Sequence, residues 1–193
     1  MRKYGTIIAF LCLCPVISSA KTDWRLRSPA QIAAGDLVFR RGNGAWTWLF
    51  VGASTKEKRF SHVGIVVENT PNECMIIHAE ANDLGKGKVR IEPWHIFFKG
   101  AAEGAVYRCT YDNVKPENIV KESKRYLGAS FDNEFDASND SKIYCSELIM
   151  LSINAAAGKT LITPTRRGQY KIIGLDDIYL TGFKKIYDSK LNK

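Results

Sequence analysis

Short apolar runs broken by turn-forming residues fill the chain from about residue 37 to residue 110 and indicate β-strands. Clusters such as Glu68–Asn72 and Asn82–Gly85 combine Gly, Pro, Asn and Asp, the residue types that favour turns. The pattern predicts strands over residues 37–40, 62–67, 74–81, 87–91 and 105–110, a short helix over 45–52, and one helical turn over 93–98.

The second half of the chain has helical spacing instead. A helix is predicted from Pro116, a favourable first-turn residue, to Leu127, with Gly128 ending it. Residues 143–157 are apolar nearly all round, which predicts a helix buried at the centre of the fold. A final amphipathic segment, residues 175–187, is expected to pack on the outside. Strands and helices in separate blocks predict an α+β fold.

The first twenty residues have the pattern of a secretory signal peptide. Arg2 and Lys3 form a positive start, residues 7–16 are apolar, and small residues precede a cleavage site after Ala20. An uncleaved membrane anchor is the alternative. The sequence therefore predicts an exported protein, periplasmic or secreted, whose mature domain spans residues 21–193.

The chain is basic, with 28 Lys and Arg against 20 Asp and Glu and a net charge of +8, and it stays positive without the leader. Such a surface suits an anionic envelope polymer or peripheral contact with an anionic membrane. The basic residues are scattered and no aromatic residues interleave them, so no nucleic acid partner is expected. No CxxC or paired-histidine spacing appears, so we expect no metal and no cofactor.

Cys145 stands at the head of the apolar helix, just after a polar run. Unpaired N–H groups and the helix dipole at such a position favour a thiolate, a good nucleophile. His62 lies at the start of a predicted strand, where it can act as the base. Loss of the leader leaves three cysteines, so at least one is unpaired. Cys145 is the candidate, while Cys74 and Cys109 either pair or stay as two buried thiols.

Strand periodicity supplies a third group for this pair. In the segment 74–81 successive side chains alternate faces, so His78 and Glu80 share one face and can both point toward His62. A catalytic base needs a neighbour that fixes its tautomer. Glu80 would do so by its charge and His78 by a neutral hydrogen bond, and the periodicity leaves both open.

Four motifs come in an informative order: Gly35-Asp36-Leu37, Ser61-His62-Val63-Gly64, the stretch 126–136, and Tyr144-Cys145-Ser146-Glu147. Together they resemble the circularly permuted branch of the NlpC-type papain-like cysteine peptidases, the YiiX-like proteins. In the ordinary branch the cysteine comes first, whereas here the histidine comes first and the cysteine helix last. Lecithin:retinol acyltransferase-like enzymes share that order. The resemblance covers roughly residues 34–188.

The resemblance implies a permuted papain-like fold in which an antiparallel sheet packs against a central helix bearing the cysteine. It implies His78 as the third catalytic residue, with Glu80 as the alternative, and it puts Asp36 near the site. Tyr144, next to the nucleophile, is expected either to support the substrate and its oxyanion or to be an ordinary core tyrosine.

Three functions compete on this basis. The first is an exported amidase or peptidase that cuts peptidoglycan peptides through a thioester on Cys145, with His62 moving the proton and the Cys145 N–H group stabilising the oxyanion. The second is a thiol acyl hydrolase or acyltransferase that acts on an acyl lipid. The third is a non-catalytic envelope binding protein, which the presence of Cys145, His62 and His78 together disfavours.

Overall fold

The computed structural model describes residues 23–44, 47–82, 84–137, 141–167 and 170–190. The expected signal peptide over residues 1–20 lies outside this part of the chain and stays a prediction. Within the described ranges, no helix has both the length and the apolar composition needed to cross a membrane.

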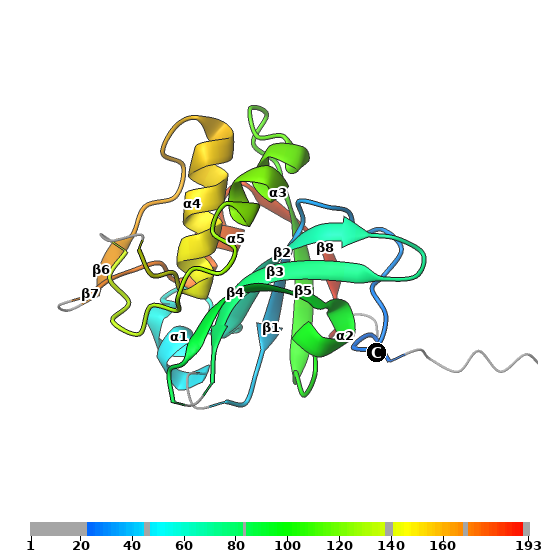
Figure 1. The fold of residues 1–193 in the computed structure, drawn as a ribbon, viewed down its shortest axis with the longest axis horizontal. Helices are drawn as coiled ribbons and strands as arrows, with labels where there is room; N and C mark the ends of the chain where they lie inside the picture. Colours follow the sequence, from blue (N-terminus) through cyan, green and yellow to red (C-terminus); the bar gives the residue numbers. More distant parts are fainter. Residues whose placement is uncertain (1–22, 45–46, 83, 138–140, 168–169, 191–193) are drawn as a thin grey trace, which may run out of the picture.

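A six-stranded antiparallel sheet forms the centre of the molecule (Figure 1), with the strand order β4-β3-β2-β1-β5-β8. Its strands are β1 Leu37–Arg41, β2 His62–Asn69, β3 Cys74–Ala81, β4 Gly87–Pro93, β5 Glu103–Cys109 and β8 Phe183–Asp188. Strands β1 to β4 form a meander apart from the helix inserted between β1 and β2. Strand β2, which begins with His62, therefore pairs with β3, which carries His78 and Glu80.

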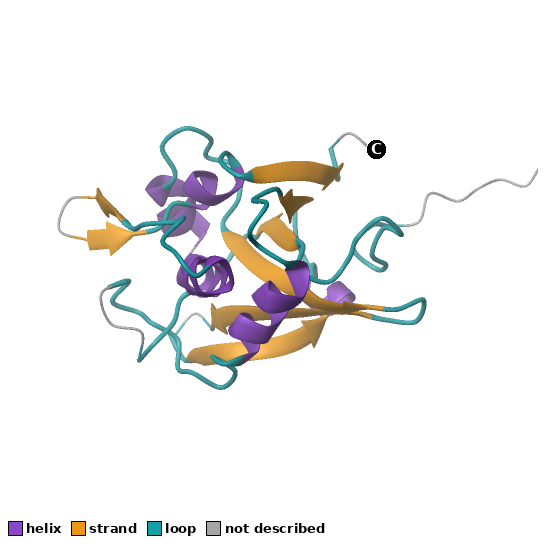
Figure 2. Cartoon of the chain, turned by 90° about the horizontal axis from the view of Figure 1, so that it is seen from above, coloured by secondary structure: helices purple, strands orange, loops and turns teal. Residues whose placement is uncertain are grey.

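Helices cover both faces of this sheet unequally (Figure 1). One face packs against four helices, α1 Thr47–Ala53, α3 Pro116–Lys124, α4 Cys145–Ala157 and α5 Leu175–Tyr179, and this layer holds the larger hydrophobic core. The other face carries α2 Trp94–Phe97 and a smaller core. A separate hairpin, β6 Thr165–Arg167 with β7 Tyr170–Ile172, projects away from the sheet (Figure 2). The predicted α+β class with an antiparallel sheet is confirmed.

Local sequence explains how the site elements meet. The buried helix α4 begins after Tyr144, whose backbone is extended, and ends at Gly158, which adopts a left-handed φ of 64°. Strand β2 contains Gly64, where a Cβ atom would lie 2.6 Å from Ile76 Cγ2 and 3.1 Å from Phe97 Cε2. Only a glycine there lets α2 pack directly on the sheet beneath the histidines.

Most predicted elements are present with shifted ends, and one prediction is wrong. Strand β3 has the predicted bounds, whereas α4 begins two residues later than expected, at Cys145. The segment 175–187 is no single amphipathic element on the outside. It forms α5, a turn at Gly182 with φ 73°, and β8, which pairs with β5 at the sheet edge. The helix ends at Tyr179, and Gly182 forms the turn directly before the strand.

An ion-pair cluster ties β8 to the loop before β2. Asp188 accepts hydrogen bonds from Arg59 at 2.8 and 2.6 Å and from Lys185 at 2.9 Å, and its side chain is 4 % exposed. Burial alone would raise the pKa of Asp188, but these hydrogen bonds outweigh it and hold the pKa well below its usual range.

We therefore expect Asp188→Asn to lower the free energy of unfolding by about 3 kcal/mol at pH 7, because Arg59 keeps its charge with one partner removed. The folded-state pKa is depressed, so the stabilisation is complete above the unfolded value of about 3.9 and is lost as the pH falls toward the folded value. Denaturant titrations should show the difference between mutant and wild type shrinking below about pH 4. The exposed Asp112→Asn is the control; an equal effect from both would contradict the assignment.

Candidate active site

The start of α4 meets the start of β2, which brings Cys145 next to the histidine strand. The backbone N–H groups of Val63 and Ser146 lie close enough to the Cys145 sulfur to lower the pKa of the thiol. Ladder pairing between β2 and β3 begins only at Ile65↔Ile77, and before that point the Val63 N–H is directed at the thiol. Val63 directly follows His62, so the Cys145 sulfur lies beside the backbone of the strand that begins with His62.

The two histidines form a buried pair. His62 Nε2 lies 2.9 Å from His78 Nδ1, and the side chains are on adjacent strands. Phe97 of α2 packs against both imidazoles, with ring centroids 5.5 Å from His62 and 5.1 Å from His78. His78 is fully buried and His62 is 8 % exposed, so the pair contacts the outside only through His62. This geometry fits the expected role of His78 as the neighbour of the base.

Glu80, the alternative third residue, is held elsewhere. It forms ion pairs with Arg40 of β1 and with Arg90 of β4, the latter at 3.0 Å. Its carboxylate is 3.8 Å from His78 Nδ1, beyond hydrogen-bond distance. Glu80 therefore contributes charge next to the histidines while its oxygens bind the two guanidinium groups.

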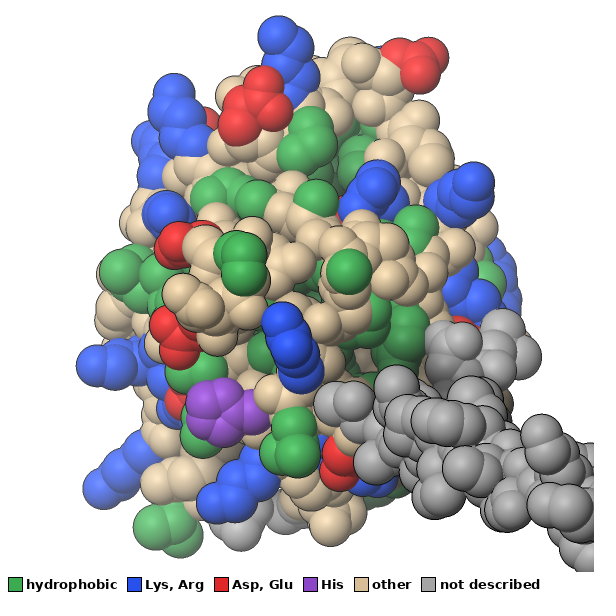
Figure 3. All heavy atoms as spheres, turned by 90° about the vertical axis from the view of Figure 1, so that its right-hand side faces the viewer, with side chains coloured by type: hydrophobic (Ala, Val, Ile, Leu, Met, Phe, Trp, Pro, Cys, Tyr) green, Lys and Arg blue, Asp and Glu red, His purple; other side chains and the backbone are tan. Residues whose placement is uncertain are grey.

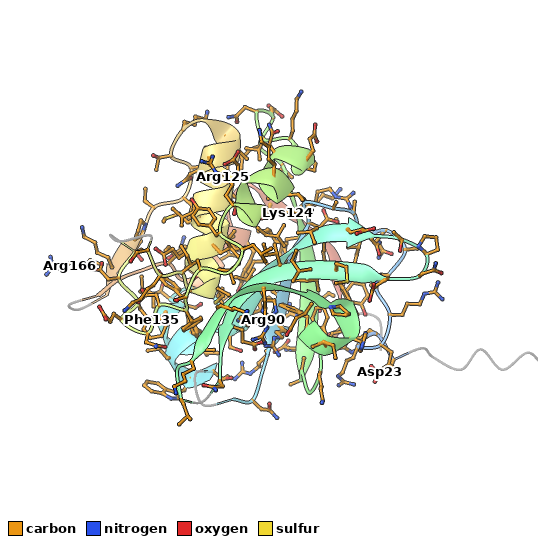
Figure 4. The ribbon with its side chains drawn as sticks, viewed as in Figure 1. Asp23, Arg90, Lys124, Arg125, Phe135 and Arg166 are labelled. Atoms are coloured by element: carbon orange, nitrogen blue, oxygen red, sulfur yellow. The ribbon has the colours of Figure 1, made fainter. Side chains whose placement is uncertain are left out.

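Sequence analysis missed Glu92, which lies 3.0 Å from His78 Nε2. The predicted strand stopped at residue 91, whereas β4 continues to Pro93. In the observed register His78 is opposite Arg90, so Glu92 is its diagonal neighbour on the same face. Arg90 lies on the side of the β4 ribbon away from α4 (Figure 4). The alternation of Arg90 and Glu92 would have indicated this contact, had the strand end been placed correctly.

The thiol and the base are both neutral in this environment, contrary to the expected thiolate. Burial raises the pKa of Cys145 to about 12 and outweighs the N–H groups of Val63 and Ser146, which lower it. Burial also holds the pKa of His62 well below its usual 6.5, and the positive charge of Arg40 adds to this. The helix terminus is thus too weak to ionise a fully buried thiol. A neutral thiol would need to lose its proton before the sulfur could act as a nucleophile.

A cleft of about 230 Å³ leads to His62. Polar and charged side chains dominate its lining, with Arg40, Asn43, Thr47, Ser61, His62 and Glu80 around it and Phe50 and Phe131 as its aromatic wall. Phe135 supports that wall by packing against Phe50 at 5.4 Å, and its backbone has a left-handed φ of 54°. Phe135 lies near the end of α4 that carries Cys145 (Figure 4).

The other two predicted site residues have structural roles. Asp36 lies beyond the far end of β1, about 13 Å along the strand from Arg40, and Arg108 binds both its oxygens at 2.8 Å. The structure therefore does not bring Asp36 together with His62 and His78. Tyr144 is fully buried, and its hydroxyl oxygen accepts a hydrogen bond from Ile173 N–H at 3.1 Å. Of the two expected roles, substrate support or an ordinary core residue, Tyr144 has the position of the core residue and anchors the start of α4.

The three described cysteines are all free. Cys74 is buried in the smaller core and Cys109 is half-buried on β5, and burial raises the pKa of both thiols. Of the two alternatives for this pair, the disulfide is excluded in this structure.

His62, His78 and Glu80 also offer three ligand atoms within 4.8 Å of one another. Two imidazoles and a carboxylate are a ligand set that zinc accepts. Two features oppose a cation here: the guanidinium groups of Arg40 and Arg90 already neutralise Glu80, and the two imidazoles are hydrogen-bonded to each other. The expectation of a metal-free site stays a prediction.

The surface shows no continuous basic field on the face in Figure 3, where Lys and Arg side chains are scattered among Asp, Glu and apolar residues. This distribution agrees with the scatter of basic residues along the sequence.

Comparison with known proteins agrees with the fold. The profile of the permuted papain-like amidase enzymes, the YaeF/YiiX or C92 family, matches residues 31–173. The crystal structure of metalloprotein YiiX from Escherichia coli O157:H7 is similar with a TM-score of 0.65 and 16% identity, covering 81% of this chain and 97% of that chain. No curated protein is significantly similar. The family profile spans well over half of the sequence, and the chain belongs to the permuted papain-like amidase family of cysteine peptidases.

Proposed function

We propose that this protein is an exported cysteine amidase that cuts amide bonds in peptidoglycan peptides, with Cys145 as nucleophile and His62 as base. The observation that carries the proposal is the meeting of α4 and β2, where the Cys145 sulfur lies near the backbone N–H of Val63 and the preceding residue, His62, lines a polar cleft. Membership of an amidase family supports the reaction class.

In this mechanism His62 takes the thiol proton as the Cys145 sulfur attacks the amide carbonyl, forming the S–C bond. Collapse of the tetrahedral intermediate breaks the C–N bond, and His62 gives its proton to the leaving amine. Water then attacks the thioester with its proton passing to His62, and the departing sulfur recovers that proton. The N–H groups at the start of α4, that of Cys145 first, stabilise the negative charge on the carbonyl oxygen.

The cleft supports a short polar substrate. Its volume of about 230 Å³ is small for a ligand site, and charged or hydrogen-bonding side chains surround the approach to His62. Peptidoglycan peptides carry free carboxylates, which the net positive charge of the protein attracts. Export, as the first twenty residues indicate, would bring the enzyme to that polymer.

An acyl lipid is the second candidate substrate, because an apolar hollow adjoins the cleft. Trp48 of α1 is 74% exposed and lines this hollow with Val51, between the basic residues Arg41 and Lys58. An exposed tryptophan flanked by cations suits the interface of an anionic membrane. The same Cys145 and His62 would then act on an ester or thioester.

The test is an assay of the purified mature protein, first dialysed against a chelator, on cell-wall muropeptides and on phospholipid vesicles. We expect new amino groups from muropeptides, no fatty acid from vesicles, and a rate that falls as salt rises, since screening weakens the attraction of carboxylates to the basic protein. Retained activity after dialysis is expected because the mechanism uses no metal.

Fatty-acid release without amine release would contradict peptidoglycan as the substrate and would leave the assignment of Cys145 as nucleophile unchanged. Failure to turn over either substrate would favour the non-catalytic binding protein. Activity that disappears on dialysis and returns with Zn²⁺ would contradict the metal-free mechanism.

A further inference from the structure

We propose that Glu92 is a positioning residue that sets the tautomer of the His62 base through His78, so that three strands carry one directional line of hydrogen bonds that ends at His62. The proposal adds a residue role to the proposed cysteine amidase function, and its kinetic test rests on that function. A second test measures the tautomers of the two imidazoles beside the Glu92 carboxylate and needs no substrate.

The contacts run in one line across the sheet. Glu92 Oε2 lies 3.0 Å from His78 Nε2, and His78 Nδ1 lies 2.9 Å from His62 Nε2. Arg90 forms an ion pair with the other oxygen of Glu92, with Nε at 2.6 Å. Both nitrogens of the fully buried His78 are used, one on each side. His78 is therefore a link between a charge and the base, and it carries no charge of its own when neutral.

The carboxylate fixes the direction of every bond in this line. An ionised carboxylate only accepts hydrogen bonds, so His78 Nε2 must carry a hydrogen and donate it to Glu92. Neutral His78 then has its lone pair on Nδ1, which makes His62 Nε2 the donor. This leaves the lone pair of His62 on Nδ1, the ring nitrogen that takes part in neither the contact between the histidines nor the contact with Glu92. A neutral His62 in this tautomer is ready to accept the Cys145 proton.

Glu92 fits this role better than Glu80 does. The pKa of Glu92 is lowered, chiefly by its hydrogen bond to His78, so Glu92 is ionised at neutral pH. The oxygens of Glu80 are taken by Arg40 and Arg90, and its closest approach to His78 is 3.8 Å.

The hydrogen-bonded line from Glu92 to His62 also affects the charge balance around His62. The charged and titratable groups on the strands near His62 are Arg40 from β1, His78 and Glu80 from β3, and Arg90 and Glu92 from β4. Helix α2 contributes the uncharged Phe97, and the Cys145 thiol of α4 lies near the backbone of the next residue, Val63. Arg40 and Arg90 disfavour a positive imidazole. When His62 takes the thiol proton, the hydrogen-bonded line to Glu92 offers negative charge that offsets this repulsion.

Glu92→Gln tests the proposal because it keeps the shape and an accepting oxygen while removing the charge. We expect kcat for muropeptide amide cleavage to fall about 10- to 100-fold with KM little changed. The acid limb of the kcat/KM profile should move to lower pH, because loss of the carboxylate makes His62 harder to protonate. The matched control is Glu68→Gln, an exposed glutamate on the strand of His62, which should stay within about twofold of wild type.

A substrate-free arm uses ¹⁵N NMR of the histidine rings in the whole protein. We expect the Nε2–H tautomer at both His62 and His78 in wild type, and a mixture of tautomers in Glu92→Leu, which has no acceptor. Wild-type His78 with its hydrogen on Nδ1, or unchanged tautomers in Glu92→Leu, would overturn the proposal. If no muropeptide is cleaved, the proposed function fails while the NMR arm still decides the role of Glu92.

Discussion

Replacing Cys145 with alanine is expected to abolish amide cleavage, lowering the rate by about 10⁴-fold or more, while the protein still folds. The thiol is the only group in the proposed mechanism that bonds to the substrate, and without it His62 has no proton to accept. Cys145 is fully buried in the larger core, so the mutant loses one sulfur atom of packing, at a cost of about 1 kcal/mol.

Cys74→Ala is the matched control, because Cys74 is also a free, buried cysteine but lies in the smaller core on the other face of the sheet. Both mutants should show similar losses in a denaturant titration, and only the Cys145 mutant should lose turnover. Equal turnover in the two mutants would remove Cys145 from the mechanism.

The second largest effect is expected from His62→Gln, with a loss of about 10²- to 10⁴-fold in kcat. The Cys145 thiol has a pKa of about 12, so it needs a base within reach to react at neutral pH. Glutamine keeps a polar side chain beside His78 but cannot take up a proton. The control is His95→Gln, because His95 is exposed on α2.

The lowered pKa of His62 also predicts the direction in which the wild-type pH profile is shifted. His62 works only when neutral, and burial with nearby Arg40 lowers its pKa. Activity should therefore persist as the pH falls through 6.5 and decline only at the lowered pKa. A profile that already falls by half near pH 6.5 would mean that His62 is solvated and the site differs from this structure.

Sequence periodicity alone could predict much of the sheet and the central helix. The alternation in residues 74–81 defined β3 and the face that His78 and Glu80 share. The apolar run up to Ala157 defined α4, because a helix apolar on all sides has to be buried. The prediction of one amphipathic element over residues 175–187 was wrong, because the same spacing also fits a short helix and a strand joined by a turn at Gly182.

The site shows where sequence reasoning ends. Which side chains share a strand face follows from period two, but the partner across the sheet depends on register, and register placed Glu92 beside His78. Ionisation also escaped prediction, because a helix N-terminus lowers a thiol pKa by less than full burial raises it, and burial of Cys145 depends on the whole fold. Asp36 was misplaced because its Gly-Asp turn lies at the other end of its strand.

The most direct test of the central claim is to trap the acyl-enzyme. The whole protein is mixed with muropeptides and, in parallel, with p-nitrophenyl acetate as a probe of any acylated nucleophile, quenched in acid during turnover, and mapped by mass spectrometry. The account predicts an acyl group on Cys145 that hydroxylamine removes, with none on Cys74 or Cys109. Turnover without an adduct on Cys145, or an adduct on another cysteine, would contradict it.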